Sequence, residues 1–188
     1  MTEWIISDTH FGHHNIIEYA SRPFQSVGHM DRVMISRWQG TVAPDDIVYH
    51  LGDVGLSNGR YDLSTVIAQL PGRKVLLRGN HDKNPESMRK AGFDVVLEQA
   101  VVRVDGVDFQ LQHKPSLFKA GPDGDYILHG HIHNSTPESR MEHESKGELV
   151  HIPSFNINMC VEMWNYTPVS FHWLVKELAR RERAEKKK

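Results

Sequence analysis

Five short groups of polar residues carry side chains that bind metal ions. The groups are Asp8-Thr9-His10, Gly52-Asp53, Gly79-Asn80-His81-Asp82, His113 and Gly130-His131-Ile132-His133. Carboxylate, imidazole and amide donors suit divalent ions such as Mn, Fe and Zn, and no thiolate is among them. Asp8 with His10, and His131 with His133, are spaced so that each pair points to one side of an extended segment. Together the groups predict a catalytic metal centre.

Each group taken singly has a structural explanation. Asp8-Thr9-His10 could be a turn or helix cap, Gly79-Asn80-His81-Asp82 a tight turn, and His113 a partly buried strand residue. The ordered set argues against these explanations, because every member follows a segment with strand character. The groups also hold five of the 13 histidines in this 188-residue chain. We therefore interpret the excess of imidazole as functional in these positions.

Apolar segments with strand character alternate with helical patterns in the first half of the chain. Strands are predicted at Trp4–Ile6, Ile47–Tyr49 and Lys74–Leu77, with helices near His13–Tyr19, His29–Trp38 and Leu63–Leu70. Asn84 and Pro85 are typical of the start of another helix, which would end before Gly92. The alternation favours an α/β fold. Ligand sites in such folds form at the carboxyl ends of strands, where several loops converge on a rigid sheet.

The second half is richer in β-strands. Val101–Val104 and Val107–Leu111 flank Asp105-Gly106, which is a strong β-hairpin signal. Further strands are predicted at Tyr126–Leu128 and Leu149–Ile152, separated by a long polar loop at 134–147. Loops of this length are often functional.

Charge and composition exclude several classes of protein. Lys and Arg number 22 against 24 Asp and Glu, so the formal charge of -2 gives no overall attraction to nucleic acid or an anionic membrane. The single cysteine, Cys160, cannot form an intrachain disulfide and is expected to be a small buried residue. We see no secretory signal and no apolar run near the roughly 20 residues of a membrane-spanning helix. These features predict a cytoplasmic protein.

The length predicts a single domain over residues 1–175, followed by a charged helix end or tail at 176–188. That tail contains seven basic and three acidic residues. We interpret it as a solvated helix end rather than a nucleic-acid-binding patch.

The five groups, in this order, resemble the signature of the calcineurin-like metallophosphoesterase superfamily. The resemblance covers residues 8 to 133, and the segments Ser7–His13 and Trp164–Val169 are similar to those of small, capless members from bacteria and phages. It implies a four-layer α/β/β/α sandwich with two central mixed β-sheets. A helical first half and a strand-rich second half agree with that fold.

Carried over by position, the resemblance implies two divalent metal ions. Asp8, His10, Asp53 and His133 would hold the first ion, and Asp53, Asn80, His113 and His131 the second. Mn²⁺ is the expected metal, with Fe, Zn, Ni or Mg as alternatives. Two such ions, less the charges of two aspartates and a bridging hydroxide, leave about +1 to attract a phosphate ester. The hydroxide would be the nucleophile.

The resemblance also implies roles for histidines that are not ligands. His81 would be catalytic, donating a proton to the leaving group or stabilising the developing alkoxide, and Asp82 could orient it. Asn80 and His81 would contact the substrate. His13, which follows Gly12 at a predicted helix N-terminus, is either a phosphate contact or an ordinary helix-capping or surface histidine.

One difference from the protein-phosphatase branch of this family narrows the range of predicted activities. Gly52-Asp53 is followed by Val54–Ser57, without the Asp-Arg-Gly extension of the protein-phosphatase branch, although Arg78 or Arg60 could supply an arginine contact. We therefore predict a phosphoesterase that acts on phosphodiesters, and on phosphomonoesters as a further class, with small nucleotide-like substrates. The alternatives are a protein-binding scaffold on the same fold and a nuclease or nucleic-acid end-processing enzyme that uses the basic tail. No membrane partner is expected, and the oligomeric state stays open.

Overall fold

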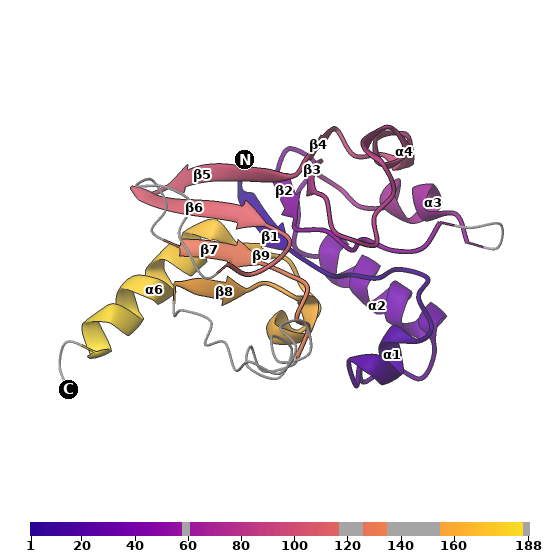
Figure 1. The fold of residues 1–188 in the computed structure, drawn as a ribbon, viewed down its shortest axis with the longest axis horizontal. Helices are drawn as coiled ribbons and strands as arrows, with labels where there is room; N and C mark the ends of the chain where they lie inside the picture. The colour runs from indigo at the N-terminus through magenta and orange to yellow at the C-terminus, as the bar shows by residue number, and fades with distance from the viewer. Residues whose placement is uncertain (58–60, 117–125, 135–154, 186–188) are drawn as a thin grey trace.

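The computed structural model describes residues 1–57, 61–116, 126–134 and 155–185, which form two β-sheets with helices packed against them (Figure 1). The strands are β1 (Glu3–Ile6), β2 (Ile47–His50), β3 (Arg73–Leu77), β4 (Val95–Leu97), β5 (Gln99–Val104), β6 (Val107–Gln112), β7 (Tyr126–His129), β8 (Asn156–Asn158) and β9 (Val169–Ser170). The helices are α1 (Ile16–Tyr19), α2 (Val27–Gln39), α3 (Leu63–Ile67), α4 (Pro85–Ala91), the 3-10 helix η1 (Val161–Trp164) and α6 (Phe171–Glu185).

The first sheet has the strand order β4-β3-β2-β1-β9. Its first four strands are parallel, whereas β9 pairs antiparallel with β1. Parallel neighbours require crossover connections, and α2, α3 and α4 lie in those connections. The carboxyl ends of β1, β2 and β3 consequently lie at the same edge of the sheet.

The second sheet has the order β5-β6-β7-β8, with an antiparallel hairpin followed by parallel pairs. The hairpin turns at Asp105 and Gly106, whose φ angles of 49° and 83° are those of a type I′ turn. Both sheets are therefore mixed, and the predicted α/β fold with two central mixed sheets is confirmed.

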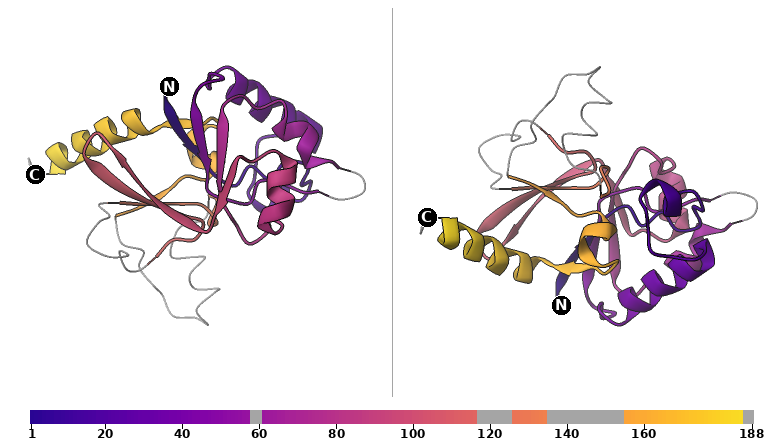
Figure 2. Two further views of the ribbon diagram at one scale, coloured as in Figure 1. Left: turned by 90° about the horizontal axis from the view of Figure 1, so that it is seen from above. Right: turned by 90° about the horizontal axis from the view of Figure 1, so that it is seen from below.

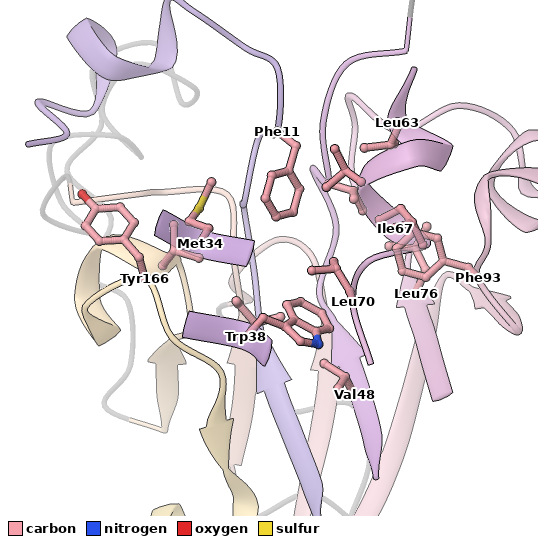
Figure 3. Packing of buried hydrophobic residues seen from close by; sticks show 14 of the residues in the cluster. Phe11, Met34, Trp38, Val48, Leu63, Ile67, Leu70, Leu76, Phe93 and Tyr166 are labelled. Atoms are coloured by element: carbon pink, nitrogen blue, oxygen red, sulfur yellow. The ribbon is translucent and has the colours of Figure 1, made fainter. Parts of the chain in front are cut away.

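One face of the first sheet packs against α1 to α4 and forms the first hydrophobic core. Trp38 and Met34 of α2 lie in this core with Val48 of β2 and Leu76 of β3 (Figure 3). Trp38 is buried, and its indole N–H donates to the carbonyl of Pro71 at 3.0 Å. The helical layer is thereby held against the sheet both by apolar burial and by a hydrogen bond.

The other face of the first sheet packs against the second sheet. Ile5 of β1 lies in this second core, whereas its neighbour Ile6 lies in the first, as the alternation of side chains along a strand requires. Phe109 of β6 and Phe171 of α6 meet here with ring centroids 5.5 Å apart. Helix α6 packs against β1, β9 and β5, and so joins strands of both sheets (Figure 2).

Each strand and helix predicted within the described residues is present, but two helices are shorter than predicted. The helix near His13 begins only at Ile16, because Gly12 has a left-handed φ of 74° and the His13 N–H bonds back to the His10 carbonyl. Helix α3 ends at Ile67. After it, the N–H groups of Gln69 and Leu70 bond to carbonyls three residues earlier, as in a 3-10 helix, and the chain enters the Pro71-Gly72 turn. The predicted strand at 149–152, and the predicted loop at 134–147 apart from Asn134, lie outside the described residues.

Helix α6 continues through Glu185, so the charged segment from Lys176 onward is helical as far as the structure describes it. None of the helices in the described ranges is long and apolar enough to cross a membrane.

Candidate metal centre

The predicted ligands lie in loops that follow strands of both sheets. Asp8, Asp53 and Asn80 come after β1, β2 and β3 of the first sheet, and His113, His131 and His133 come after β6 and β7 of the second. Backbone hydrogen bonds tie these loops together: Asp8 N–H donates to Gly52, His10 N–H to Asp53, and Gly130 N–H to His113. Packing of the two sheets therefore brings the two halves of the candidate site together.

One group of side chains gathers around Asp8. His10 Nε2 lies 3.9 Å from Asp8 Oδ1 and 3.7 Å from Asp53 Oδ2. His133 Nε2 lies 3.8 Å from the same Asp8 oxygen, and the rings of His10 and His133 are 5.1 Å apart. These four residues are the set that the sequence predicts for the first metal ion.

A second group gathers on the other side of Asp53. His113 Nε2 lies 3.5 Å from Asp53 Oδ2 and 2.9 Å from Asn80 Oδ1, and the rings of His113 and His131 are 5.1 Å apart. Asp53, His113 and His131 offer ligand atoms that all lie within 4.8 Å of one another, as do Asp8, His10 and Asp53. Asp53 therefore belongs to both groups, as the bridging role that the family resemblance implies would require.

The imidazole of His113 lies among oxygen acceptors. Its Nδ1 lies 2.8 Å from the Leu51 carbonyl, which can only accept, so Nδ1 carries a proton. Its Nε2 lies 2.9 Å from Asn80 Oδ1 and 3.5 Å from Asp53 Oδ2. These oxygens favour a positive charge at Nε2: a proton supplies it in the metal-free protein, and a bound divalent ion would replace that proton.

Electrostatics of the site agree with that conclusion. Burial alone would lower the pKa of His113, but the Asp53 carboxylate outweighs it and raises this pKa to about 9. Burial, followed by the neighbouring His133, lowers the pKa of His10 well below its usual value, so this imidazole is neutral. Its buried Nε2 has no hydrogen-bond partner among the described residues. A neutral imidazole with a free nitrogen has the state that a metal ligand requires, so the donor set fits divalent ions.

Unusual backbone conformations aim these side chains. Nine non-glycine residues in the described ranges have positive φ, and five of them are predicted ligands: Asp8, His10, Asp53, His131 and His133. Left-handed conformations cost energy for such residues and persist only where the surrounding structure imposes them, often at functional sites. No signal in the sequence indicates these φ angles.

Glycines allow the loops to approach the carboxylates. A Cβ atom at Gly79 would lie 2.2 Å from Asp53 Oδ1, and one at Gly130 would lie 2.0 Å from Asp8 Oδ2. Neither position can hold a larger residue without displacing a carboxylate. The glycines in these two motifs are thus part of the site geometry.

Asp8 is oriented mainly through Oδ2. This oxygen accepts hydrogen bonds from Ser7 Oγ, the His131 N–H and Cys160 Sγ, at 2.5, 3.0 and 3.4 Å, and the His131 N–H also lies 3.1 Å from Oδ1. Burial raises the pKa of the Cys160 thiol well above its usual value, so Cys160 is a neutral donor to Asp8. Cys160 is buried, as the sequence predicts, and Asp8 Oδ1 faces His10 and His133.

Asp82 has a different role from orienting His81, which the sequence leaves open. Its carboxylate accepts the backbone N–H groups of Asp53, Val54 and Gly79 at 2.8 to 2.9 Å. Adjacent side chains on an extended segment point apart, which explains the difference. Asp82 therefore holds the loops that carry Asp53 and Asn80.

The non-ligand histidines lie beside the predicted ligands. His81 is largely exposed, with Nε2 4.0 Å from Asp53 Oδ2, and its backbone N–H donates to Asp53 Oδ1.

The ring of His13 lies 5.5 Å from that of His10. His13 precedes the short helix α1 by a turn, so the predicted position at a helix N-terminus is wrong. Burial, followed by His81, lowers the pKa of His13.

Two buried charged residues escaped the sequence analysis. The guanidinium of Arg22 and the carboxylate of Glu162 form an ion pair at 2.7 Å, and Glu162 Oε1 lies 3.0 Å from His133 Nδ1. They are separated by 140 positions in the chain. Neither belongs to a motif, so only the tertiary structure reveals them.

A cavity of about 370 Å³ opens beside Asn80 and His113. Its other lining residues are Arg78, Gly79, Glu98, Gln112 and Lys114. Arg78 pairs with Glu98 at 2.8 Å, and Arg60, the other arginine considered in the sequence, lies outside the described residues.

Comparisons with known proteins agree with the fold. A family model described as calcineurin-like phosphoesterase matches residues 1–111. The uncharacterized protein MJ1445 of Methanocaldococcus jannaschii is 37% identical over 175 residues, which span 92% of this chain and 89% of that protein. The gene 66 protein of Mycobacterium phage L5 is 29% identical, over 74% of this chain and 81% of its own. The crystal structure of AQ665, a protein of unknown function from Aquifex aeolicus, superposes with a TM-score of 0.71 at 28% identity, covering 93% of this chain and 98% of that one.

Proposed function

Because this chain belongs to the calcineurin-like phosphoesterase family, we propose that it hydrolyses phosphodiesters at a centre of two divalent metal ions. The observation that carries the proposal is the Asp53 carboxylate, which belongs to two groups of three side chains whose ligand atoms lie within 4.8 Å of one another. A divalent ion between Asp53 and His113 would replace the proton that the imidazole otherwise carries there. Family membership supports hydrolysis of phosphate esters, and the geometry supports the metal centre.

The two groups around Asp53 would hold one ion each. Asp8, His10, Asp53 and His133 are the proposed ligands of the first ion, and Asp53, Asn80, His113 and His131 those of the second. Mn²⁺ is the metal we propose, since oxygen and imidazole donors predominate. A bound pair of ions lowers the pKa of a water molecule and neutralises charge on the phosphoryl oxygens.

His81 is the proposed general acid. Its side chain is 63% exposed and lies beside Asp53 without being enclosed by the ligands, so it can reach a substrate. There it would donate a proton to the leaving oxygen, which otherwise departs as a costly alkoxide. His13, whose ring lies 5.5 Å from that of His10, is a proposed contact to a phosphoryl oxygen.

The cavity beside Asn80 and His113 favours a diester over a monoester. A diester carries a second substituent on phosphorus, and this cavity borders the proposed second metal position with room for such a group. Arg78 and Lys114 give part of its wall positive charge, which suits a nucleotide-like substituent. The missing Asp-Arg-Gly extension after Asp53 argues against a phosphoprotein substrate.

Hydrolysis of chromogenic model esters tests the proposal. The Mn²⁺-loaded protein should hydrolyse bis(p-nitrophenyl) phosphate faster than p-nitrophenyl phosphate. Asp53→Asn should abolish both activities, and His81→Ala should lower kcat by about 10²-fold or more with metal content retained. His29→Ala, at a histidine of α2 outside the site, is the matched control.

Several outcomes would overturn the proposal. Full activity in both site variants would refute the assigned roles. A protein that binds no divalent ion and hydrolyses no ester would favour the protein-binding scaffold instead. Preference for polynucleotides, lost on removal of residues 176–188, would favour a nuclease that uses the basic tail. A cytoplasmic location remains a prediction.

A further inference from the structure

We propose that the buried Arg22–Glu162 pair is the positioning unit of the first metal position, holding His133 so that its Nε2 faces Asp8 and His10. The inference rests on the proposed metal centre and adds two residues that are not ligands. Both side chains are almost completely buried, with exposed fractions of 0% for Arg22 and 4% for Glu162. They lie between the loop after β1 and the loop after β7.

Glu162 determines which nitrogen of His133 carries the proton. Its carboxylate Oε1 lies 3.0 Å from His133 Nδ1, and an ionised carboxylate can only accept a hydrogen bond. Nδ1 is therefore the donor, and Nε2 keeps its lone pair. That nitrogen lies 3.8 Å from Asp8 Oδ1, on the side of the first metal position. A carboxylate behind a ligating imidazole both orients the ring and makes it a stronger ligand.

Arg22 holds Glu162 in place and also holds the loop that carries Asp8. Its Nε and Nη2 lie 2.9 and 2.7 Å from Glu162 Oε1. Its Nη2 also donates to the Asp8 carbonyl at 2.6 Å, and its Nη1 donates to the Thr9 carbonyl at 2.8 Å. One guanidinium thus connects the backbone beside two proposed ligands, Asp8 and His10, to the side chain behind a third, His133.

The geometry is poorly suited to a role in stability alone. A stabilising arginine–carboxylate pair commonly engages both carboxylate oxygens. Here the contacts from Arg22 and His133 converge on Oε1, and the buried Oε2 has no hydrogen-bond partner among the described residues. Burying two charges costs solvation energy that their attraction often fails to recover. A bridging oxygen between guanidinium and imidazole is what a positioning role requires.

His113, at the second metal position, is oriented in a different way. Its Nδ1 bonds to the backbone carbonyl of Leu51, which no substitution of a side chain removes. Changing Glu162 should therefore weaken the first position and spare the second. This asymmetry distinguishes positioning of His133 from a general loss of stability.

The test is binding of Mn²⁺ by the full chain, measured by equilibrium dialysis and electron paramagnetic resonance. Wild type should bind two ions. Glu162→Gln should weaken the binding of one ion about 10–100-fold and leave the binding of the other unchanged, and Glu162→Ala should weaken binding of the same ion at least as much.

Asp46→Asn is the matched control. Asp46 is a buried carboxylate at the opposite end of β2, where it accepts the Thr2 N–H and the Trp4 indole N–H. It should bind two ions as wild type does.

Each result decides the matter. Two unchanged ions in Glu162→Gln would overturn the inference and leave the proposed metal centre standing, whereas no binding by wild type would overturn both. Equal weakening of both ions, matched by Asp46→Asn, would mean that Glu162 acts only through stability. If the Glu162 variants do not fold, ¹⁵N spectra of wild type decide: His133 should carry its proton on Nδ1, and a proton on Nε2 would refute the inference.

Discussion

His50 offers a test of the hydrogen-bond network beneath the candidate site. It is buried at the end of β2, where its Nδ1 accepts the Gly52 N–H at 3.2 Å and its Nε2–H donates to Thr9 Oγ1 at 2.9 Å. The Thr9 hydroxyl in turn donates to the Val54 carbonyl at 2.7 Å. Protonation of Nδ1 would remove the acceptor of the Gly52 N–H and bury a charge. Burial accordingly lowers the pKa of His50 to about 3.

This pKa predicts how stability depends on pH. An unfolded histidine has a pKa of about 6.5, so between pH 6.5 and pH 3 the unfolded chain binds a proton at His50 that the folded chain does not. The contribution of neutral His50 is complete above about pH 6.5 and decreases as the pH falls, by about 1.4 kcal/mol per unit. From pH 8 to pH 5 the loss should be about 2 kcal/mol.

Urea unfolding of wild type and His50→Gln at pH 8 and pH 5 measures this contribution. A glutamine side chain can accept the Gly52 N–H and donate to Thr9, and it does not titrate in this range. Wild type should lose about 2 kcal/mol more than His50→Gln on acidification. His14→Gln, at an exposed position, controls for loss of an imidazole. Equal losses in wild type and His50→Gln would refute the assigned network.

Three further predictions concern the site itself. Gly130→Ala should abolish tight Mn²⁺ binding in equilibrium dialysis, because a Cβ atom there would lie 2.0 Å from Asp8 Oδ2; unchanged binding would contradict the close approach of these loops. Arg78→Ala should raise KM for a phosphodiester about fivefold with kcat nearly unchanged, as expected for a partly exposed charge contact of roughly 1 kcal/mol; an equal loss in kcat would assign the contact to the transition state. Chelation of the metal should lower the unfolding midpoint by roughly 5–11 °C per ion in calorimetry, since each ion at 100 times its Kd contributes about 2.7 kcal/mol; no shift would mean that the centre does not bind metal in the folded state.

Periodicity and turn chemistry predict most of the fold. The helix over Pro85–Ala91 has its Asn84 cap, with the Ser87 N–H bonded to the Asn84 side chain, and ends at a left-handed Gly92. The Asp105-Gly106 hairpin is equally local. The sequence predictions are wrong where tertiary contacts shorten a predicted helix. Helix α1 begins late because the turn at Gly12 is held by the Asp31 carboxylate, which also accepts the Tyr61 hydroxyl from a distant loop.

The residues of the candidate site likewise fall into those that motifs predict and those that depend on tertiary contacts. Motif order is enough to propose that Asp8, Asp53 and His113 belong to one site, because each follows a strand and strand ends converge, but only the structure brings them together. The carboxylate behind His133 is different, since Glu162 lies in a 3-10 helix with no motif around it. A residue that acts through a buried contact leaves no periodic pattern, so its role depends on packing that a single sequence does not reveal.

The division of the centre between two sheets links metal binding to packing of the second core. Asp8 and Asp53 belong to the first sheet, and His131 and His133 to loops of the second, so the ligands meet only when the sheets are packed face to face. Left-handed conformations at these four residues oppose that state, because each costs energy. The apolar contacts between the sheets must supply that energy before any ion binds. An ion that binds only the packed state then adds its binding free energy to the same contacts. The proposed centre would therefore be strained before an ion binds, and packing of the core between the sheets would contribute to how strongly it binds one.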